Sequence, residues 1–234
     1  MTLRIISDTH GKNNRLGNRY YHAPAAEEGR TYLKILDNAD QNGIKHTLQI
    51  GDIGWREDLA IMAGLSPDYH KVLYGNHDDY DNILPHSIGD YGIMTHGGVE
   101  FGYVRGEYSI DRWRRLDPAE VARYGKTYWD QEEIPYSEMM EALDFFTGRD
   151  ITLFISHGAP DFIIHHLVDE IRYAPSRTSK LLTEIHDAAN IKNWVFGHYH
   201  RNVELISNKG TKLRCINELS YCDIDESYNF SQTF

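Results

Sequence analysis

The sequence predicts an α/β fold with a layered β-sheet, and two patterns along the chain favour it. Short apolar runs repeatedly end at a polar residue or a glycine, which is typical of buried strands. Longer segments between them carry apolar residues at helical spacing and stop at breaking residues. Strands that alternate with helices in this way indicate helices packed on a sheet.

The predicted elements follow in order along the chain. Strands are predicted at Leu3–Ser7, Thr47–Ile50, Val72–Tyr74, Tyr91–Thr95, Val99–Arg105, Ile151–Ser156 and Trp194–Phe196. Helices are predicted at Glu27–Asn42, Glu57–Leu65, Ser137–Phe146 and Ser179–Ala189. In the first of these helices, Leu33, Leu36 and Ala39 recur at helical spacing, and Gly43 follows as a stop signal.

Length and composition predict one domain over residues 1–234. The chain has 234 residues, of which 41% are hydrophobic and 25% charged, the balance of an ordinary globular protein. Its formal net charge of −11 disfavours nonspecific binding to nucleic acid. No apolar run approaches the roughly 20 residues that cross a bilayer, and we expect no membrane contact. Cys215 and Cys222 are expected to be reduced packing residues, and we predict a cytoplasmic protein.

Five predicted strands end at side chains that can bind a metal ion. The blocks are Asp8-x-His10, Gly51-Asp52, Gly75-Asn76-His77-Asp78, His157 and Gly197-His198-x-His200. Ligands in α/β sheets gather at the carboxyl ends of strands, so we expect these side chains to meet. Carboxylate, amide and imidazole groups without a thiolate suit Mn²⁺, Fe or Zn²⁺. Each block alone would suggest a turn, a cap or a surface histidine, but the five together predict a metal centre.

With these five blocks in this order, the chain resembles the calcineurin-like metallophosphoesterase superfamily, in particular its small bacterial and bacteriophage type. The signature spans residues 8 to 200. The resemblance implies a layered αββα sandwich of mixed β-sheets flanked by helices, with a small cap-like insert at about residues 98–148. It also implies two divalent metal ions. The first would be held by Asp8, His10, Asp52 and His200, and the second by Asp52, Asn76, His157 and His198, so that Asp52 bridges both.

The same resemblance implies a phosphoesterase that uses in-line attack by a metal-bridging hydroxide. Two ions about 3.5–4 Å apart can clamp such a displacement. We favour Mn²⁺, with Fe, Zn²⁺ or Ni²⁺ as alternatives. Asp52 and His77 are the two candidate catalytic residues. His77 would protonate the leaving group, since imidazole suits acid catalysis near neutral pH. Alternatively, His77 only hydrogen-bonds the phosphate. Asp78 either orients His77 or caps the following turn.

Three residues are candidate substrate contacts: Asn76, Arg56 and Arg105. Arg56 lies four residues after Asp52, as does an arginine of the serine/threonine protein phosphatases, and a guanidinium can grip phosphate. It could equally lie at the start of a surface helix. Trp55 replaces an Asp of that subgroup, and the chain keeps both histidines of Gly-His-x-His, so the general phosphoesterase subgroup fits better.

Arginine and aromatic residues gather between the third and fourth blocks. The stretches Gly106–Arg115 and Tyr124–Pro135 resemble the insert of small bacterial and bacteriophage metallophosphoesterases. They could bind a phosphorylated ring such as a nucleotide, or pack locally. We therefore predict a phosphatase that acts on small phosphorylated molecules, nucleotides or phosphoprotein. A phosphodiesterase or nuclease of the same superfamily and a non-catalytic metal-binding scaffold are the alternatives.

Overall fold

Two mixed β-sheets form the centre of the computed structural model, which describes residues 1–10, 31–54, 57–168 and 176–231. The first sheet has the strand order β11–β10–β1–β2–β3 and the second the order β4–β5–β6–β7–β9–β8. Strands β1, β2 and β3 run parallel to one another, as do β5, β6, β7 and β9, while β4, β8, β10 and β11 pair antiparallel.

The strands of the first sheet are β1 Thr2–Ser7, β2 His46–Gln49, β3 His70–Val72, β10 Ser220–Asp225 and β11 Phe230–Ser231. Those of the second sheet are β4 Tyr91–His96, β5 Val99–Val104, β6 Asp150–Ser156, β7 Asn190–Phe196, β8 Val203–Ile206 and β9 Lys212–Cys215. All seven predicted strands are present, and the strand predicted at Val72–Tyr74 lies two residues earlier in the chain.

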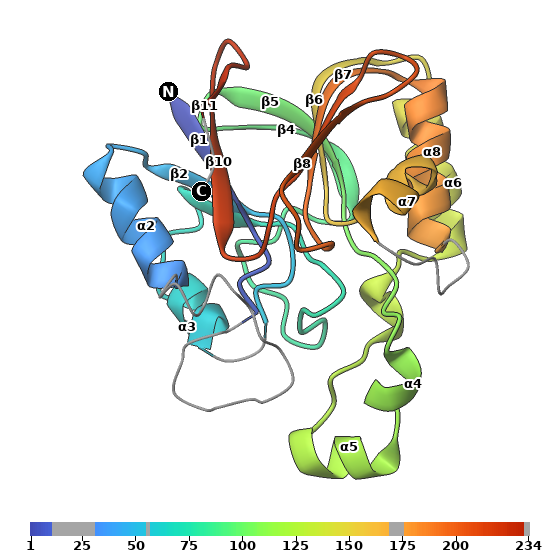
Figure 1. The fold of residues 1–234 in the computed structure, drawn as a ribbon. Helices are drawn as coiled ribbons and strands as arrows, with labels where there is room; N and C mark the ends of the chain where they lie inside the picture. Colours follow the sequence, from blue (N-terminus) through green and yellow to red (C-terminus); the bar gives the residue numbers. More distant parts are fainter. Residues whose placement is uncertain (11–30, 55–56, 169–175, 232–234) are drawn as a thin grey trace.

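Helices cover the outer face of each sheet (Figure 1). On the first sheet lie α2 Tyr32–Gln41 and α3 Glu57–Ala63, and on the second α6 Tyr136–Phe146 and α8 Arg177–Ala188. The short helices η2 Asp161–Ile163 and α7 Ile164–Leu167 join the second layer. Side chains cap two of these helices, because Thr31 accepts a hydrogen bond from the Lys34 N–H and Ser176 accepts one from the Ser179 N–H.

Three apolar cores hold these layers together. Leu3 and Ile5 of β1 pack between the sheets with Phe101 of β5. A second core joins the outer face of the second sheet to α6 and α8, and a third joins the first sheet to α2 and α3. Each large apolar side chain that is fully buried stabilises the fold by about 1.5–3 kcal/mol. The predicted layered αββα sandwich of mixed sheets is confirmed.

The part of the chain that lies outside these layers is shorter than the insert predicted at residues 98–148. Within those bounds, β5 pairs with β4 and β6 inside the second sheet, and α6 packs against α8. Residues 106–135 form neither a strand of these sheets nor one of the helices that cover them, and we call these residues the arm. The arm carries α4 Arg112–Arg115, α5 Pro118–Tyr124 and the single turn η1 Asp130–Glu132. Figure 1 shows α4 and α5 beyond the ends of both sheets.

Among the described residues, none of the helices combines the length and the apolar character needed to cross a bilayer.

Candidate metal centre

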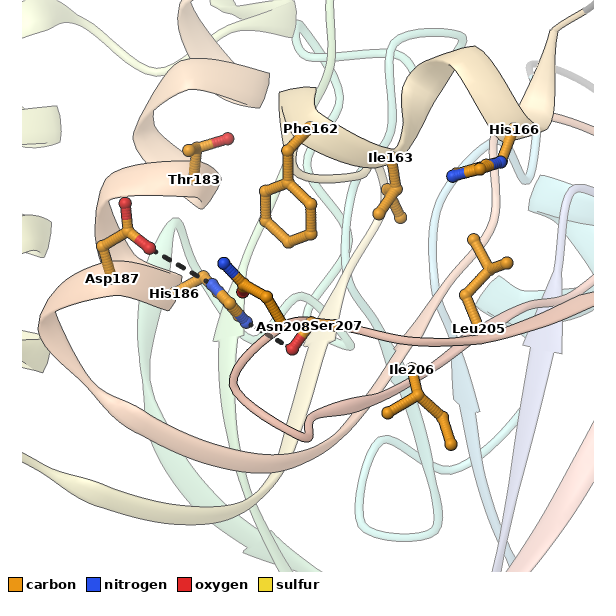
Figure 2. Close-up of a pocket in the computed structure, with 10 residues that line it drawn as sticks. All are labelled: Phe162, Ile163, His166, Thr183, His186, Asp187, Leu205, Ile206, Ser207 and Asn208. Atoms are coloured by element: carbon orange, nitrogen blue, oxygen red, sulfur yellow. Dashed lines mark hydrogen bonds and ion pairs between the residues drawn. The ribbon is translucent and has the colours of Figure 1, made fainter.

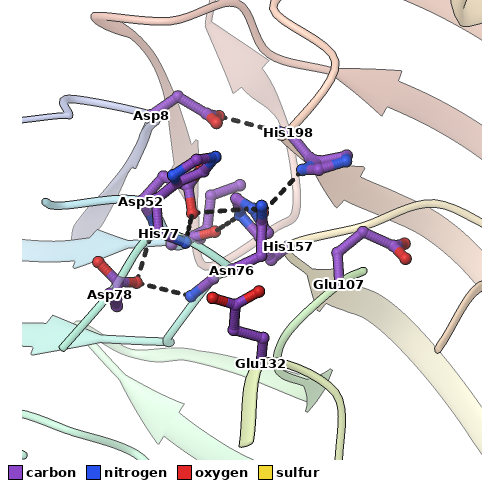
Figure 3. A network of polar contacts seen from close by, with 12 residues as sticks. Asp8, Asp52, Asn76, His77, Asp78, Glu107, Glu132, His157 and His198 are labelled. Atoms are coloured by element: carbon purple, nitrogen blue, oxygen red, sulfur yellow. Dashed lines mark hydrogen bonds and ion pairs between the residues drawn. The ribbon is translucent and has the colours of Figure 1, made fainter. Parts of the chain in front are cut away.

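The metal-binding candidates meet where the two sheets end (Figure 3). Asp8 follows β1, Asp52 follows β2, Asn76 and His77 follow β3, His157 follows β6, and His198 and His200 follow β7. Because parallel strands end at the same edge of a sheet, these side chains converge although up to 192 residues separate them in the chain. They form two groups.

The first group consists of Asp8, His10 and His200. One ligand atom of each lies within 4.8 Å of those of the other two. The Nε2 atoms of His10 and His200 are 2.9 Å apart, and Asp8 Oδ1 lies 3.5 Å from Nε2 of His200. Three donor atoms that converge this closely are suited to share one cation.

The second group consists of Asp52, His157 and His198, whose ligand atoms also lie within 4.8 Å of one another. Asn76 joins them, since its Oδ1 lies 3.0 Å from His157 Nε2 and 2.9 Å from His198 Nδ1. The Nδ1 of His157 lies 2.9 Å from the Ile50 carbonyl oxygen, which can only accept, so this nitrogen carries the proton. When the ring of His157 is neutral, its Nε2 atom can therefore bind a cation.

Asp52 connects the two groups. Its Oδ1 lies 3.2 Å from Nε2 of His157 in the second group, and its Oδ2 lies 3.8 Å from Nε2 of His10 in the first. The side chain is 1% exposed, and Oδ1 also accepts a hydrogen bond of 2.8 Å from the His77 backbone N–H. One carboxylate that faces both groups is the arrangement expected of a bridging ligand.

The surroundings of Asp8 fit a bound cation. Its side chain is fully buried, yet Oδ1 has no hydrogen-bond partner within the described part of the chain. A buried acceptor without a partner is destabilising by about 1–3 kcal/mol unless an ion or water satisfies it. The residues present therefore fit the metal centre that the resemblance implies.

The backbone is strained at the same positions. Five of the seven non-glycine residues with positive φ in the described ranges are candidate ligands. They are Asp8 (44°), His10 (56°), Asp52 (56°), His198 (66°) and His200 (52°). This conformation is uncommon for residues with a Cβ atom and concentrates at functional sites. The packing around the centre therefore holds the ligands in conformations that an isolated loop would rarely adopt.

Two glycines allow the ligand loops to approach. A Cβ atom at Gly51 would overlap the His157 ring and lie 2.9 Å from the Gly75 Cα atom, and one at Gly75 would overlap the Asp52 carboxylate. Any side chain at either position would push the ligands apart, which explains why glycine precedes both blocks.

Opposite charges control the protonation of the buried ligands. Burial raises the pKa of Asp52, but His157 and other imidazoles outweigh it and hold this pKa well below its usual range. Burial lowers the pKa of His157, but the carboxylates of Asp52 and Asp8 raise it overall to about 10. Burial and the positive charge of His157 lower the pKa of His198 to about 3. Without a bound cation, His157 is therefore protonated, and its positive charge balances the negative charge of these carboxylates. A bound cation would take over this role.

No model of a known protein family matches the sequence, and no curated protein matches it significantly. A dimetal phosphatase from Danio rerio superposes with a TM-score of 0.54 and 13% sequence identity, over 95% of this chain and 91% of that chain. This chain has the calcineurin-like phosphoesterase fold.

Two further solved structures match at lower scores. An archaeal phosphodiesterase has a TM-score of 0.43 at 12% identity, over 100% of this chain and 99% of that chain. A phosphoesterase from E. coli has a TM-score of 0.44 at 11% identity, over 100% of this chain and 98% of that chain.

Asp78 supports the ligand loops of this phosphoesterase fold in a way that the sequence did not indicate. Its buried carboxylate accepts the backbone N–H groups of Asp52 (2.9 Å), Ile53 (2.8 Å), Gly54 (3.2 Å) and Gly75 (2.6 Å). Charge-assisted bonds of this kind are about twice as strong as neutral ones. Asp78 therefore ties the loop that carries Asp52 to the loop that carries the third block.

The structure gives Arg105 a packing role, contrary to the prediction that it contacts substrate. The side chain is 7% exposed, and its guanidinium is bound by the Asp90 carboxylate, the Tyr80 hydroxyl and the Gln131 carbonyl. Its guanidinium thus fastens the arm to the second sheet. The side-chain nitrogen of Asn76, Nδ2, donates a hydrogen bond to Ser109 Oγ. Arg56 lies outside the described residues.

Glu218 is a supporting residue that sequence analysis missed. Its Oε2 lies 3.5 Å from Nδ1 of His200, and its side chain is buried. Carboxylates commonly hold the second nitrogen of a metal-binding histidine and so orient the ring. No motif marks Glu218, because it follows β9 at a turn without a recognisable pattern.

A pocket of about 410 Å³ lies between η2, α8 and the turn after β8 (Figure 2). Phe162, His186 and Ser207 are among its lining residues, and none of the lining residues is a candidate ligand. The buried His186 ring is held by Ser207 and Thr211 through Nε2 and by Asp187 through Nδ1. This pocket therefore does not extend the metal centre.

Proposed function

We propose that this protein is a dinuclear metal-dependent phosphoesterase. The observation that carries the proposal is the position of Asp52, whose two oxygen atoms face two separate groups of ligand atoms. The description of the Danio rerio neighbour as a dimetal phosphatase supports the same assignment. We propose Asp8, His10, Asp52 and His200 for the first ion and Asp52, Asn76, His157 and His198 for the second, with Mn²⁺ favoured.

Bound ions would supply Lewis-acid polarisation of the phosphoryl group and acidify water at neutral pH. The chain itself supplies the positions. The turns after β1, β2 and β7 hold their ligands in left-handed backbone conformations, and Asp78 ties two of the loops together. The centre is therefore prepared for its ions without a rearrangement of the layers.

His77 is the proposed general acid. Its backbone N–H is fixed by Asp52, while its side chain is only partly buried and its ring lies edge-on to His10, with 5.4 Å between the ring centroids. Burial lowers the pKa of His77, and the Asp52 carboxylate opposes this change. A group beside the metal centre and accessible from outside can donate a proton to a leaving alcohol.

The arm favours small substrates over long nucleic acids. A groove for a phosphate backbone needs cationic groups that remain available to phosphates. Four of the five basic residues of the arm instead form ion pairs within the protein. The pairs are Arg112–Asp130, Arg114–Asp111, Arg115–Glu132 and Lys126–Asp81. We therefore propose a phosphatase that acts on small phosphorylated molecules, nucleotides or phosphoprotein, in preference to a nuclease.

Metal removal provides the direct test of this function. Protein stripped with a chelator should not cleave 4-nitrophenyl phosphate or bis-4-nitrophenyl phosphate, and Mn²⁺ should restore cleavage more effectively than Mg²⁺. Faster turnover of the monoester would support the phosphatase assignment, whereas faster turnover of the diester would support a phosphodiesterase. Protein that binds two ions and cleaves neither ester nor any nucleotide monophosphate would contradict the proposal and favour a non-catalytic scaffold.

A further inference from the structure

A buried polar network joins the arm to the proposed metal centre. Ser109 lies just before α4, Arg115 is the last residue of α4, and Glu132 lies in η1. With Asn76 they form a continuous set whose members are at most 5% exposed. Figure 3 shows Glu132 next to Asn76 and on the side opposite the histidine ligands. These contacts link residues 17 to 39 positions apart in the chain.

When Glu132 is ionised as the ion-pair partner of Arg115, the chemistry of the network determines the direction of each hydrogen bond. Arg115 can only donate, and it donates to Glu132 Oε1 at 2.7 Å and to the Ser109 hydroxyl. Glu132 accepts with its other oxygen, Oε2, from the Ser109 hydroxyl at 2.5 Å. The single hydroxyl hydrogen of Ser109 is thereby used, and its oxygen can only accept from Asn76.

This direction determines which end of the Asn76 amide faces the ligand histidines. The amino end, Nδ2, must donate to Ser109 Oγ, which lies 2.9 Å away. The carbonyl end, Oδ1, then faces His157 and His198 at 3.0 Å and 2.9 Å. Arg115 fixes the backbone as well, because both of its terminal nitrogens donate to the Asn76 carbonyl oxygen at 3.2 and 3.3 Å.

We propose that Ser109, Arg115 and Glu132 are positioning residues that present the Asn76 amide oxygen to the second ion. The inference rests on the proposed function, because it needs a cation among Asp52, Asn76, His157 and His198. An amide turned the other way would present N–H groups, which cannot bind a cation. The arm is then a structural part of the second metal site, in addition to any contact that it makes with substrate.

The test measures the affinities of the two ions separately on metal-stripped protein, by calorimetric titration with Mn²⁺. Ser109→Ala removes the acceptor for Asn76 and should lower the affinity for the second ion by about 10–100-fold. This is the usual effect of losing an outer partner of a metal ligand. The first ion should bind as in the unaltered protein. Ser109→Thr keeps the hydroxyl and should retain most of the affinity. Ser179→Ala, which removes a buried hydroxyl of α8, is the matched control.

A double-mutant cycle separates positioning from general damage to the fold. The carboxylate introduced by Asn76→Asp has two equivalent oxygens, so it needs no orientation. Ser109→Ala should therefore lower the affinity for the second ion far less in the Asn76→Asp background than in the unaltered chain. Should Ser109→Ala fail to fold, Glu132→Gln disturbs the same network and should show the same selective loss. Equal weakening of both ions, or an equal loss in both backgrounds, would overturn the inference.

The outcomes also distinguish this inference from the proposed function. If the unaltered protein binds two ions and Ser109→Ala changes neither affinity, only the positioning role is wrong. If the unaltered protein does not bind a second ion, the proposed dinuclear function fails first, and the network would then have only a structural role.

Discussion

Replacing Asp52 with Asn is expected to weaken the binding of both metal ions and to abolish phosphoester cleavage. An amide has one acceptor oxygen, so its NH₂ group must face either His10 in the first group or His157 in the second. The lost negative charge weakens the other site as well. The loss of even an outer partner of a metal ligand lowers metal affinity by about 10–100-fold. At the site that the NH₂ group faces, we therefore expect Asp52→Asn to lower metal affinity by at least about 100-fold.

The measurement is metal content after dialysis against a fixed free Mn²⁺ concentration, together with turnover. Asp8→Asn is the matched comparison, because Asp8 belongs to the first group alone. Asp8→Asn should lose the first ion and keep most of its affinity for the second ion. Two tightly bound ions and full activity in Asp52→Asn would show that Asp52 does not bridge the centre.

His77→Ala is expected to lower turnover by about 10²–10⁴-fold while both ions remain bound. The substitution keeps the backbone N–H that donates to Asp52, so the ligand geometry is preserved. The loss should depend on the leaving group. 4-Nitrophenolate leaves readily without a proton, whereas an alkoxide does not, so the defect should be much larger for an alkyl phosphate than for 4-nitrophenyl phosphate.

This leaving-group dependence separates the two roles considered for His77. If His77 only hydrogen-bonds the phosphate, its replacement would impair the cleavage of both substrates equally. It would then raise KM rather than lower kcat. His86→Ala is a suitable control, because the buried His86 ring bonds the Leu65 carbonyl and is not a candidate ligand. It should leave the ratio of the two rates unchanged.

The sequence was most informative where both faces of a strand are buried. Leu3–Ser7 and Ile151–Ser156 are nearly continuous apolar runs because they lie between two layers, and the polar residues that follow them mark the centre. The strand β10 was missed for the opposite reason. Its residues alternate between buried and half-buried, so Cys222 and Ile224 are separated by Asp223 and form no apolar run.

The sequence also did not indicate the roles of residues whose contacts form only when the chain folds. Arg105 beside a glycine at a strand end looked accessible to substrate, but Asp90 lies close enough to bind its guanidinium. Glu132 and Ser109 lie 23 residues apart with no motif in common, and only the folded arm brings them to Asn76. The sequence therefore predicted the candidate ligands, whereas their supporting partners required the structure.

The dinuclear centre is tested most directly by the electron paramagnetic resonance spectrum of metal-stripped protein reloaded with Mn²⁺. We expect two ions per chain about 3.5–4 Å apart, close enough for their spins to couple and for the six-line signal of isolated Mn²⁺ to disappear. In Asp8→Asn that six-line signal should return, with one ion bound. A single bound ion, or two ions without coupling, in the unaltered protein would contradict the dinuclear centre.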